Sequence, residues 1–134
     1  MPVEPPPSAP SAAPAGAGLT THVIDIAQGV GAAGLAVDVF RLGQGPDARG
    51  HLGRRATGAD GRSTDWLIGG GGLEAGTYEL AFRLGAYYRD SRLALPPTPF
   101  FEVARVRFQI VDPGAHHHVP LLAAPWGYTT YRGS

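Results

Sequence analysis

The chain has 134 residues, and its eleven basic and eleven acidic side chains give a formal net charge of zero. This length suits one domain with one hydrophobic core, and the balanced charge disfavours nucleic acid as a partner. All eleven basic side chains are arginines and cysteine is absent, which excludes lysine Schiff bases, thiol nucleophiles, disulfides and thiolate metal sites.

The first eighteen residues, from Met1 to Gly18, are nearly all Pro, Ala, Ser and Gly. This composition cannot bury enough apolar area to offset the ordering of the chain. We therefore predict a flexible arm or linker over residues 1–18 and a folded domain over residues 19–134. The arm has no secretory signal pattern, and no run approaches the roughly 18 apolar residues of a membrane span. We expect a cytoplasmic protein with no membrane partner.

Short segments with alternating apolar side chains follow from Leu19 onward. Residues 20–25 and 35–42 show the alternation that is typical of strands. Two further segments each place apolar residues on one face, and these residues are Tyr78, Leu80, Phe82 and Leu84, then Ala104, Val106, Phe108 and Ile110. Turn-forming Gly and Pro sequences separate the segments. One of them, the glycine run 69–72, is interpreted as a flexible connector.

Only residues 85–91 leave room for a short helix, because Pro96, Pro97 and Pro99 prevent a longer one. Several short strands with frequent turns and one short helix favour an all-β fold. The sequence therefore predicts a two-sheet β-sandwich.

Three consecutive histidines, His116, His117 and His118, are the most informative cluster of titratable residues. On a strand, alternate side chains share a face, so His116 and His118 point to one side and His117 to the other. A metal site would need a third or fourth ligand, for which His22 or His51 are candidates. The spacing matches no recognised zinc pattern, which makes metal binding the weaker interpretation.

His22 and Arg62 carry little weight when each is taken alone. A strand histidine is commonly a half-buried structural residue, and an arginine in a turn such as residues 60–62 is commonly a solvated charge. The carboxylates show no paired spacing, and the sequence has neither a GxSxG elbow nor a phosphate-binding glycine loop. Histidine, arginine, tyrosine and the C-terminal serine remain as candidates.

Three motifs occur in a fixed order between residues 19 and 134. They are LTTHVID at 19–25, DGR at 60–62, and HHHVPLL at 116–122, which runs on to GYTTYRGS at 127–134. In these motifs the chain resembles the 5-hydroxyisourate hydrolases, the transthyretin-related enzymes of urate breakdown. The closing YRGS is what separates these hydrolases from the thyroid-hormone carriers of the same fold. The chain departs from the family pattern at His117, which is commonly aromatic, and at Trp126.

The resemblance implies an eight-stranded transthyretin-like sandwich that assembles as a homotetramer, a dimer of dimers, with active sites in the channel between dimers. It implies that His22, Arg62, His118 and Ser134 are catalytic, and that His22, Arg62 and Tyr131 bind the substrate. The reaction would be the ring-opening hydrolysis of 5-hydroxyisourate, a cyclic amide, to 2-oxo-4-hydroxy-4-carboxy-5-ureidoimidazoline in purine catabolism. No metal or cofactor is implied.

We hypothesise that His22 and His118 act as neutral general bases toward water. Arg62 would disfavour a second positive charge beside it, orient the substrate carbonyl groups and stabilise the developing oxyanion. Two alternatives stay open. One is a transthyretin-like carrier that binds a small ligand without catalysis, and the other is a metal-binding β-domain that uses His22, His116 and His118.

Overall fold

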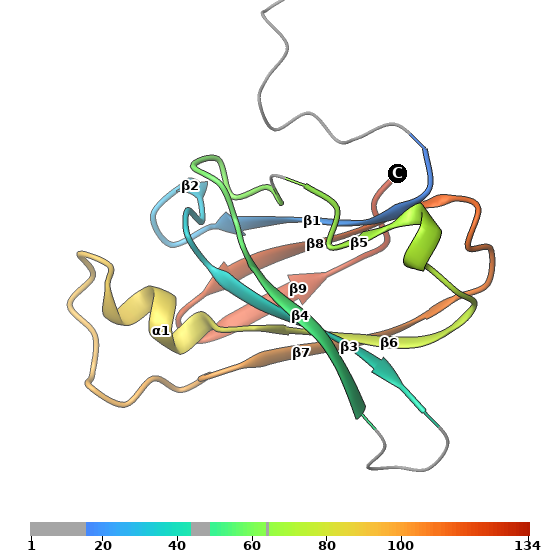
Figure 1. Cartoon of the computed structure of the whole chain (residues 1–134). Helices are drawn as coiled ribbons and strands as arrows, with labels where there is room; N and C mark the ends of the chain where they lie inside the picture. Colours follow the sequence, from blue (N-terminus) through green and yellow to red (C-terminus); the bar gives the residue numbers. More distant parts are fainter. Residues whose placement is uncertain (1–15, 44–48, 64) are drawn as a thin grey trace, which may run out of the picture.

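The computed structural model in Figure 1 describes residues 16–43, 49–63 and 65–134. Most of the predicted arm lies outside these residues, and the first strand already begins at Gly18. The strands are β1 (Gly18–Asp25), β2 (Val30–Gly31), β3 (Ala36–Leu42), β4 (Arg49–Ala56), β5 (Ile68–Gly69), β6 (Gly76–Phe82), β7 (Ala104–Ile110), β8 (His116–Ala124) and β9 (Gly127–Thr130). The helices are a 3-10 turn, η1 (Gly70–Gly72), and α1 (Leu84–Arg89).

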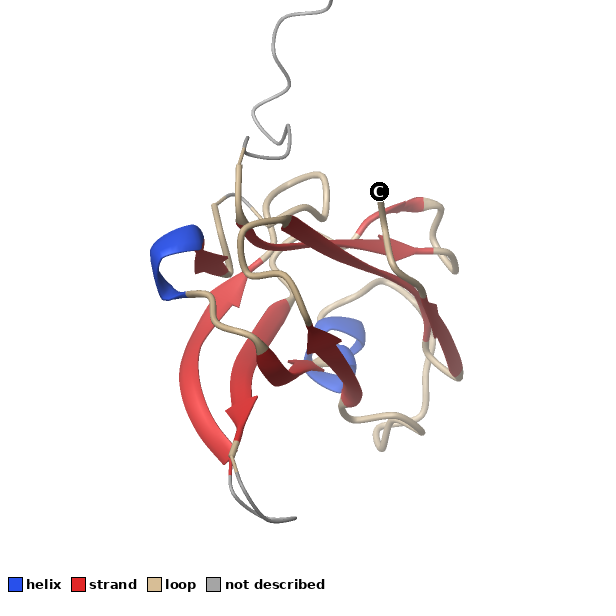
Figure 2. Ribbon diagram, turned by 90° about the vertical axis from the view of Figure 1, so that its right-hand side faces the viewer, coloured by secondary structure: helices blue, strands red, loops and turns tan. Residues whose placement is uncertain are grey.

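The strands form two sheets. One has the order β2-β1-β8-β9, with β5 also paired to β1, and the other has the order β4-β3-β6-β7. β1 and β8 run parallel, whereas the remaining pairs among the described strands are antiparallel. Figure 2 shows how little helix accompanies the strands, and no described helix has the length and apolar character to cross a membrane. The predicted all-β, two-sheet sandwich with one short α-helix is confirmed.

The inward sides of both sheets meet in one hydrophobic core. On the first sheet the core side carries alternate residues of β1 and β8, which include Leu19, Val23, Val119 and Leu121. On the second sheet it carries Tyr78, Leu80, Phe82, Ala104, Val106 and Ile110. Each large apolar side chain that is fully buried contributes about 1.5–3 kcal/mol of transfer free energy. Because strand residues alternate, the other residues of β1 and β8 face away from this core.

Two local predictions were wrong. Leu84 was expected on the apolar face of a strand, but β6 ends at Phe82 and Leu84 begins α1, from which its buried side chain still joins the core. The glycine run was expected to be a flexible connector, but Gly69 pairs with Gly18 in a short ladder and the next three glycines form η1. In both places tertiary contacts decide the local structure.

Candidate active site

The parallel pairing of β1 with β8 brings the histidines together. In this register Thr20 lies opposite His118, and His22 lies opposite Pro120. The Thr20 hydroxyl contacts both His116 and His118, so these three side chains share the outward face of the sheet. His22 follows Thr20 by two residues and therefore lies on the same face. His117 points the other way, as the alternation predicts, and is buried with its Nδ1–H donated to the Ala115 carbonyl.

A tight turn brings Arg62 to the same face. The Val23 N–H donates to the Gly61 carbonyl at 2.8 Å, and Arg62 forms an antiparallel bridge with His22. Gly61 has a φ of 83°, and a Cβ there would collide with the Val23 carbonyl oxygen, so the turn requires glycine. The turn thus fixes the arginine beside the histidine. We call Thr20, His22, Arg62, His116 and His118 the imidazole face.

Asp60 sets the environment of His22 and Arg62 at the edge of this face. The His22 Nε2 lies 3.1 Å from the Asp60 carbonyl oxygen. A carbonyl only accepts, so Nε2–H is the donor, and the neutral ring keeps its lone pair on Nδ1. The Asp60 carboxylate lies 4.0 Å from Arg62 Nε, and the arginine side chain is 38 % exposed. Part of the guanidinium is therefore open to a ligand.

Burial and neighbouring charge both favour uncharged imidazoles here. Burial lowers the pKa of His118, and the nearby His116, Arg62 and His22 lower that pKa further. Burial also lowers the pKa of His22, followed by the charge of Arg62, while contacts with Asp60 act in the opposite direction. These rings therefore lose their protons below the ordinary histidine value of 6.5. Neutral imidazole is the form that can act as a general base.

The C-terminal tail runs back along β8 and reaches the imidazole face at Gly133. The Gly133 N–H donates to the His118 carbonyl at 2.8 Å, and the two residues form an antiparallel bridge. A Cβ at Gly133 would lie 2.5 Å from His118 Cδ2, so glycine permits the close approach. Figure 1 shows the chain end at the side of the molecule where β8 begins, in agreement with the bridge between Gly133 and His118.

The two other tail candidates lie further from the His22–Arg62 pair. Tyr131 is 55 % exposed and lines a cavity of about 300 Å³ together with Arg107, His117 and His118. Neither His22 nor Arg62 lines that cavity. Ser134 is exposed and makes no hydrogen bond with any described residue. The single chain thus brings His22, Arg62 and His118 together, with Tyr131 and Ser134 on either side of the bridge at Gly133.

The described residues contain no group of three or more His, Cys, Asp or Glu side chains placed to hold a metal ion. His51, one of the candidate ligands, lies on β4 of the other sheet, where its Nε2 is 3.1 Å from Asp38. His116 Nε2 and His118 Nδ1 both turn toward the Thr20 hydroxyl. Both histidines are therefore hydrogen-bonded to a protein hydroxyl on the imidazole face.

Sequence reasoning missed two residues of this site. The Thr20 hydroxyl lies 2.6 Å from His116 Nε2 and 2.8 Å from His118 Nδ1. Trp66 packs edge-on against His116, with ring centroids 5.1 Å apart. The period-two spacing from His22 could have indicated Thr20. Trp66 follows a turn, where no periodic pattern indicates its neighbours.

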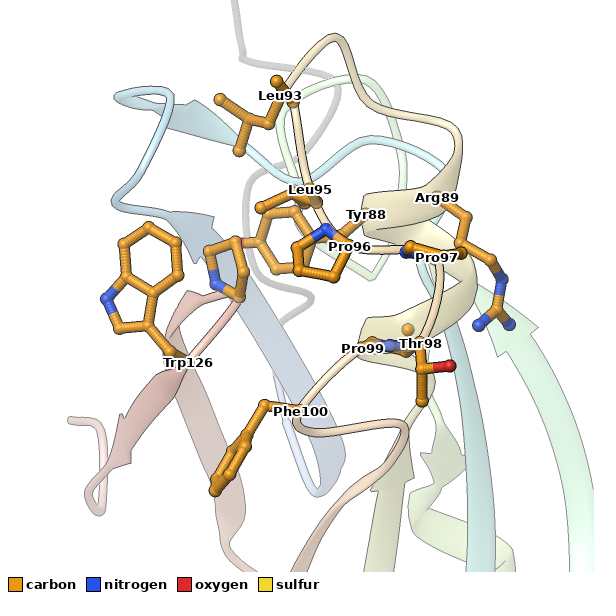
Figure 3. Close-up of a pocket in the computed structure, with 13 residues that line it drawn as sticks. Tyr88, Arg89, Leu93, Leu95, Pro96, Pro97, Thr98, Pro99, Phe100 and Trp126 are labelled. Atoms are coloured by element: carbon orange, nitrogen blue, oxygen red, sulfur yellow. The ribbon is translucent and has the colours of Figure 1, made fainter.

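A separate cavity of about 790 Å³ lies between α1, the segment 93–100 and Trp126 (Figure 3). Its lining is mostly apolar and contains neither histidine nor a carboxylate. The hydroxyl of Tyr88 is committed to the Asp25 carboxylate and the Ala123 carbonyl. This cavity therefore lacks a group for acid–base chemistry, which leaves the imidazole face as the candidate active site.

Comparison with known proteins agrees with this arrangement. Residues 19–133 match the model of the HIUase/Transthyretin family. The chain is 50 % identical over 117 residues to 5-hydroxyisourate hydrolase 2 of Rhizobium meliloti (strain 1021), covering 87 % of this chain and 95 % of that protein. Among solved structures, Klebsiella pneumoniae 5-hydroxyisourate hydrolase is similar with a TM-score of 0.70 and 33 % identity, over 88 % of this chain and 99 % of that one.

A second solved structure, that of (S)-allantoin synthase, is similar with a TM-score of 0.79 and 37 % identity. The match covers 90 % of this chain but 44 % of that longer chain. The family match spans most of the chain, and the relative from Rhizobium meliloti is covered almost completely. The protein therefore belongs to the HIUase/transthyretin family.

Proposed function

We propose that this protein hydrolyses 5-hydroxyisourate, opening a ring amide to give 2-oxo-4-hydroxy-4-carboxy-5-ureidoimidazoline. The observation that carries the proposal is the grouping of two imidazoles with lowered pKa values and one permanent cation, Arg62, on the imidazole face. The relative from Rhizobium meliloti and the Klebsiella pneumoniae structure, both 5-hydroxyisourate hydrolases by name, support the same substrate.

In the proposed mechanism, His118 acts through Nε2, because its Nδ1 is turned toward Thr20. Nε2 takes a proton from water, and the resulting hydroxide adds to the amide carbonyl carbon. The Arg62 guanidinium stabilises the oxyanion that forms, and the ring C–N bond then breaks as the leaving nitrogen receives a proton. General acid–base catalysis of this kind contributes about 10²- to 10⁴-fold to the rate. His22, whose Nδ1 is the free lone pair, orients the substrate and water.

Tyr131 and Ser134 are proposed to hold the ring and to position water or relay a proton, respectively. The bridge between Gly133 and His118 supports these roles, because it keeps both residues near the histidine. We also propose the dimer of dimers that the sequence resemblance implies, with the imidazole faces lining its channel. The outward direction of these side chains suits such an assembly. The cytoplasmic location stays a prediction.

The alternative is a transthyretin-like carrier that binds a small apolar ligand without catalysis. An apolar ligand on the imidazole face would remove water from an arginine and three imidazoles without supplying hydrogen bonds. Such burial of polar groups is unfavourable. A ligand with several amide groups, in contrast, could pair with them, which favours hydrolysis over carriage.

The test is an absorbance assay on freshly generated 5-hydroxyisourate, whose decay with purified protein is compared with its decay in buffer. We expect the full chain to accelerate the decay, and deletion of residues 131–134 to suppress the acceleration. Decay at the buffer rate with the full, folded chain would contradict the proposed function. Full activity of the truncated chain would instead remove Tyr131 and Ser134 from the mechanism and leave the hydrolase intact.

A further inference from the structure

Thr20 connects two histidines of the imidazole face through a single oxygen atom. Its Oγ lies 2.6 Å from His116 Nε2 and 2.8 Å from His118 Nδ1. Thr20 is 2 % exposed, so its side chain is almost completely shielded from bulk water in the folded chain. His116 packs against Trp66 on its other side. The Thr20 hydroxyl therefore connects His118 to His116 through two consecutive hydrogen bonds.

Two arrangements use the hydroxyl proton of Thr20 within this group. When the hydroxyl donates its one proton to one histidine, it can only accept from the other. In the first arrangement His118 Nδ1–H donates to Thr20, Thr20 donates to His116 Nε2, and the neutral His118 keeps a lone pair on Nε2. In the second arrangement His116 Nε2–H donates to Thr20, Thr20 donates to His118 Nδ1, and the neutral His118 carries its proton on Nε2. Only the first arrangement leaves Nε2 able to accept a proton from water.

We propose that Thr20 and His116 form a proton relay behind His118, which sets the tautomer of His118 and shares the proton that it takes from water. The inference rests on the proposed role of His118 as general base. Thr20 is a positioning residue in this scheme, because it reaches the substrate only through the histidine.

Each step of the relay conserves protons. When His118 Nε2 takes a proton from water, its Nδ1 proton passes to Thr20 Oγ and the original Thr20 hydroxyl proton passes to His116 Nε2. His118 is then neutral with its proton on Nε2, Thr20 is again a hydroxyl, and His116 is an imidazolium. When the leaving nitrogen takes the Nε2 proton, both relay protons return and the resting arrangement is restored.

Neighbouring charges favour transfer of the positive charge from His118 to His116. A positive charge on His118 is disfavoured by burial, and then by the neighbouring His116, Arg62 and His22. A positive charge on His116 is disfavoured by burial and by His117, with no contribution from Arg62 or His22. Moving the charge to His116 therefore takes it away from the cation. Further titratable and charged groups lie around His118, namely Asp60 in the turn beside Arg62, and Arg107, Asp112, Tyr131 and Arg132 around the cavity that His118 lines.

The first test reads the tautomer by ¹⁵N NMR of the histidine rings in the full chain, above the pH at which they titrate. We expect wild-type His118 to carry its proton on Nδ1. A proton on Nε2 would overturn the relay. This reading is independent of turnover, so it decides the inference separately from the proposed function.

The second test compares Thr20→Val, which removes the hydroxyl while keeping the branched shape, with Thr20→Ser, which restores it. We expect Thr20→Val to lower kcat by about tenfold or more with KM little changed, and Thr20→Ser to recover most of the loss. Thr21→Val is the matched control, because the Thr21 hydroxyl bonds to the Val119 carbonyl on the opposite face. We expect Thr21→Val to affect stability but not the pH profile of turnover.

The dependence of kcat on the D₂O fraction distinguishes a relay from a structural effect. Two or more protons moving together give a curved dependence in the wild type, and Thr20→Val should give a straight line. The same curvature in both proteins, or a wild-type kcat in Thr20→Val, would overturn the relay. If Thr20→Val does not fold, the same curvature comparison with His116→Gln decides the question.

Discussion

The outward faces of the two sheets differ in how their charged groups are paired. On the β4-β3-β6-β7 sheet, the Asp38 carboxylate accepts from Arg54 at 2.8 Å and from Arg83 at 2.9 Å. Glu79 on the same face lies 3.3–3.5 Å from the guanidinium groups of Arg49, Arg105 and Arg107. On the imidazole face, no described carboxylate hydrogen bonds to His22, His116 or His118.

This difference separates a structural surface from a reactive one. The hydrogen bond from Arg54 holds the pKa of Asp38 well below its usual range, so this carboxylate stays ionised throughout the ordinary pH range. No described carboxylate hydrogen bonds to the imidazoles, and at His22 burial and the Arg62 charge outweigh the opposing effect of Asp60, so the rings stay neutral and keep lone pairs for chemistry. Substitutions on the imidazole face should therefore affect turnover, whereas substitutions on the other face should affect stability.

The largest effect is expected from His118→Asn on the imidazole face. Asparagine keeps polar atoms on the strand but cannot act as a base, so kcat on 5-hydroxyisourate should fall by about 10²- to 10⁴-fold. The melting temperature should change little, because the His118 ring is only partly buried. Turnover and melting are measured on the same preparation. An unchanged kcat would remove His118 from the mechanism.

Gly133→Ala should have the next largest effect. A Cβ at this position would lie 2.5 Å from His118 Cδ2, so either the tail or the ring must move. A displacement of about 1 Å at a catalytic group can cost about 10²-fold in rate. Gly127→Ala is the matched control, because a Cβ at Gly127 meets nothing within 4 Å. Equal turnover of the two variants would show that the tail does not constrain His118.

Asp38→Asn on the other face should change stability and leave kcat unaltered. Asparagine keeps one acceptor oxygen but loses the negative charge and the second acceptor that Arg54 and Arg83 use, which should lower the free energy of unfolding by about 1–3 kcal/mol at pH 7. The folded pKa of Asp38 lies below its ordinary value of 3.8. Its stabilisation is therefore fully present above that value and is lost as the pH falls through the folded pKa. Denaturant titrations at pH 7 and pH 3 measure this change.

A fall in kcat for Asp38→Asn comparable to that of His118→Asn would contradict the separation of the two faces. The absorbance assay on the same protein sample provides this control.

The alternation of apolar residues predicted most of the strands that build the core. It could not predict β4 (Arg49–Ala56), whose residues RGHLGRRA are largely exposed and show no apolar alternation. This edge strand is fixed by its pairing with β3, which lies earlier in the sequence. β5 likewise depends on its pairing with β1. Strands of this kind are set by partners that a local pattern does not contain.

Only some residues of the candidate site could be predicted from the sequence, for a similar reason. The resemblance supplied His22, Arg62 and His118, and strand alternation correctly separated His117 from its neighbours. Thr20 could not be recognised from its own residue type, because its role depends on the register that places it opposite His118. The roles of Tyr131 and Ser134 stay predictions, since their proposed contacts involve the substrate and the assembled protein.

The pH dependence of kcat/KM tests most directly whether a neutral imidazole beside a fixed cation is the base. Activity should be present above the folded histidine pKa and lost as the pH falls through it, with the acid limb below 6.5 in the wild type. In Arg62→Gln the acid limb should move to higher pH, because the charge that lowers the pKa of His22 and His118 is gone. An acid limb at or above 6.5 in the wild type, or one that stays in place in Arg62→Gln, would contradict the proposed site.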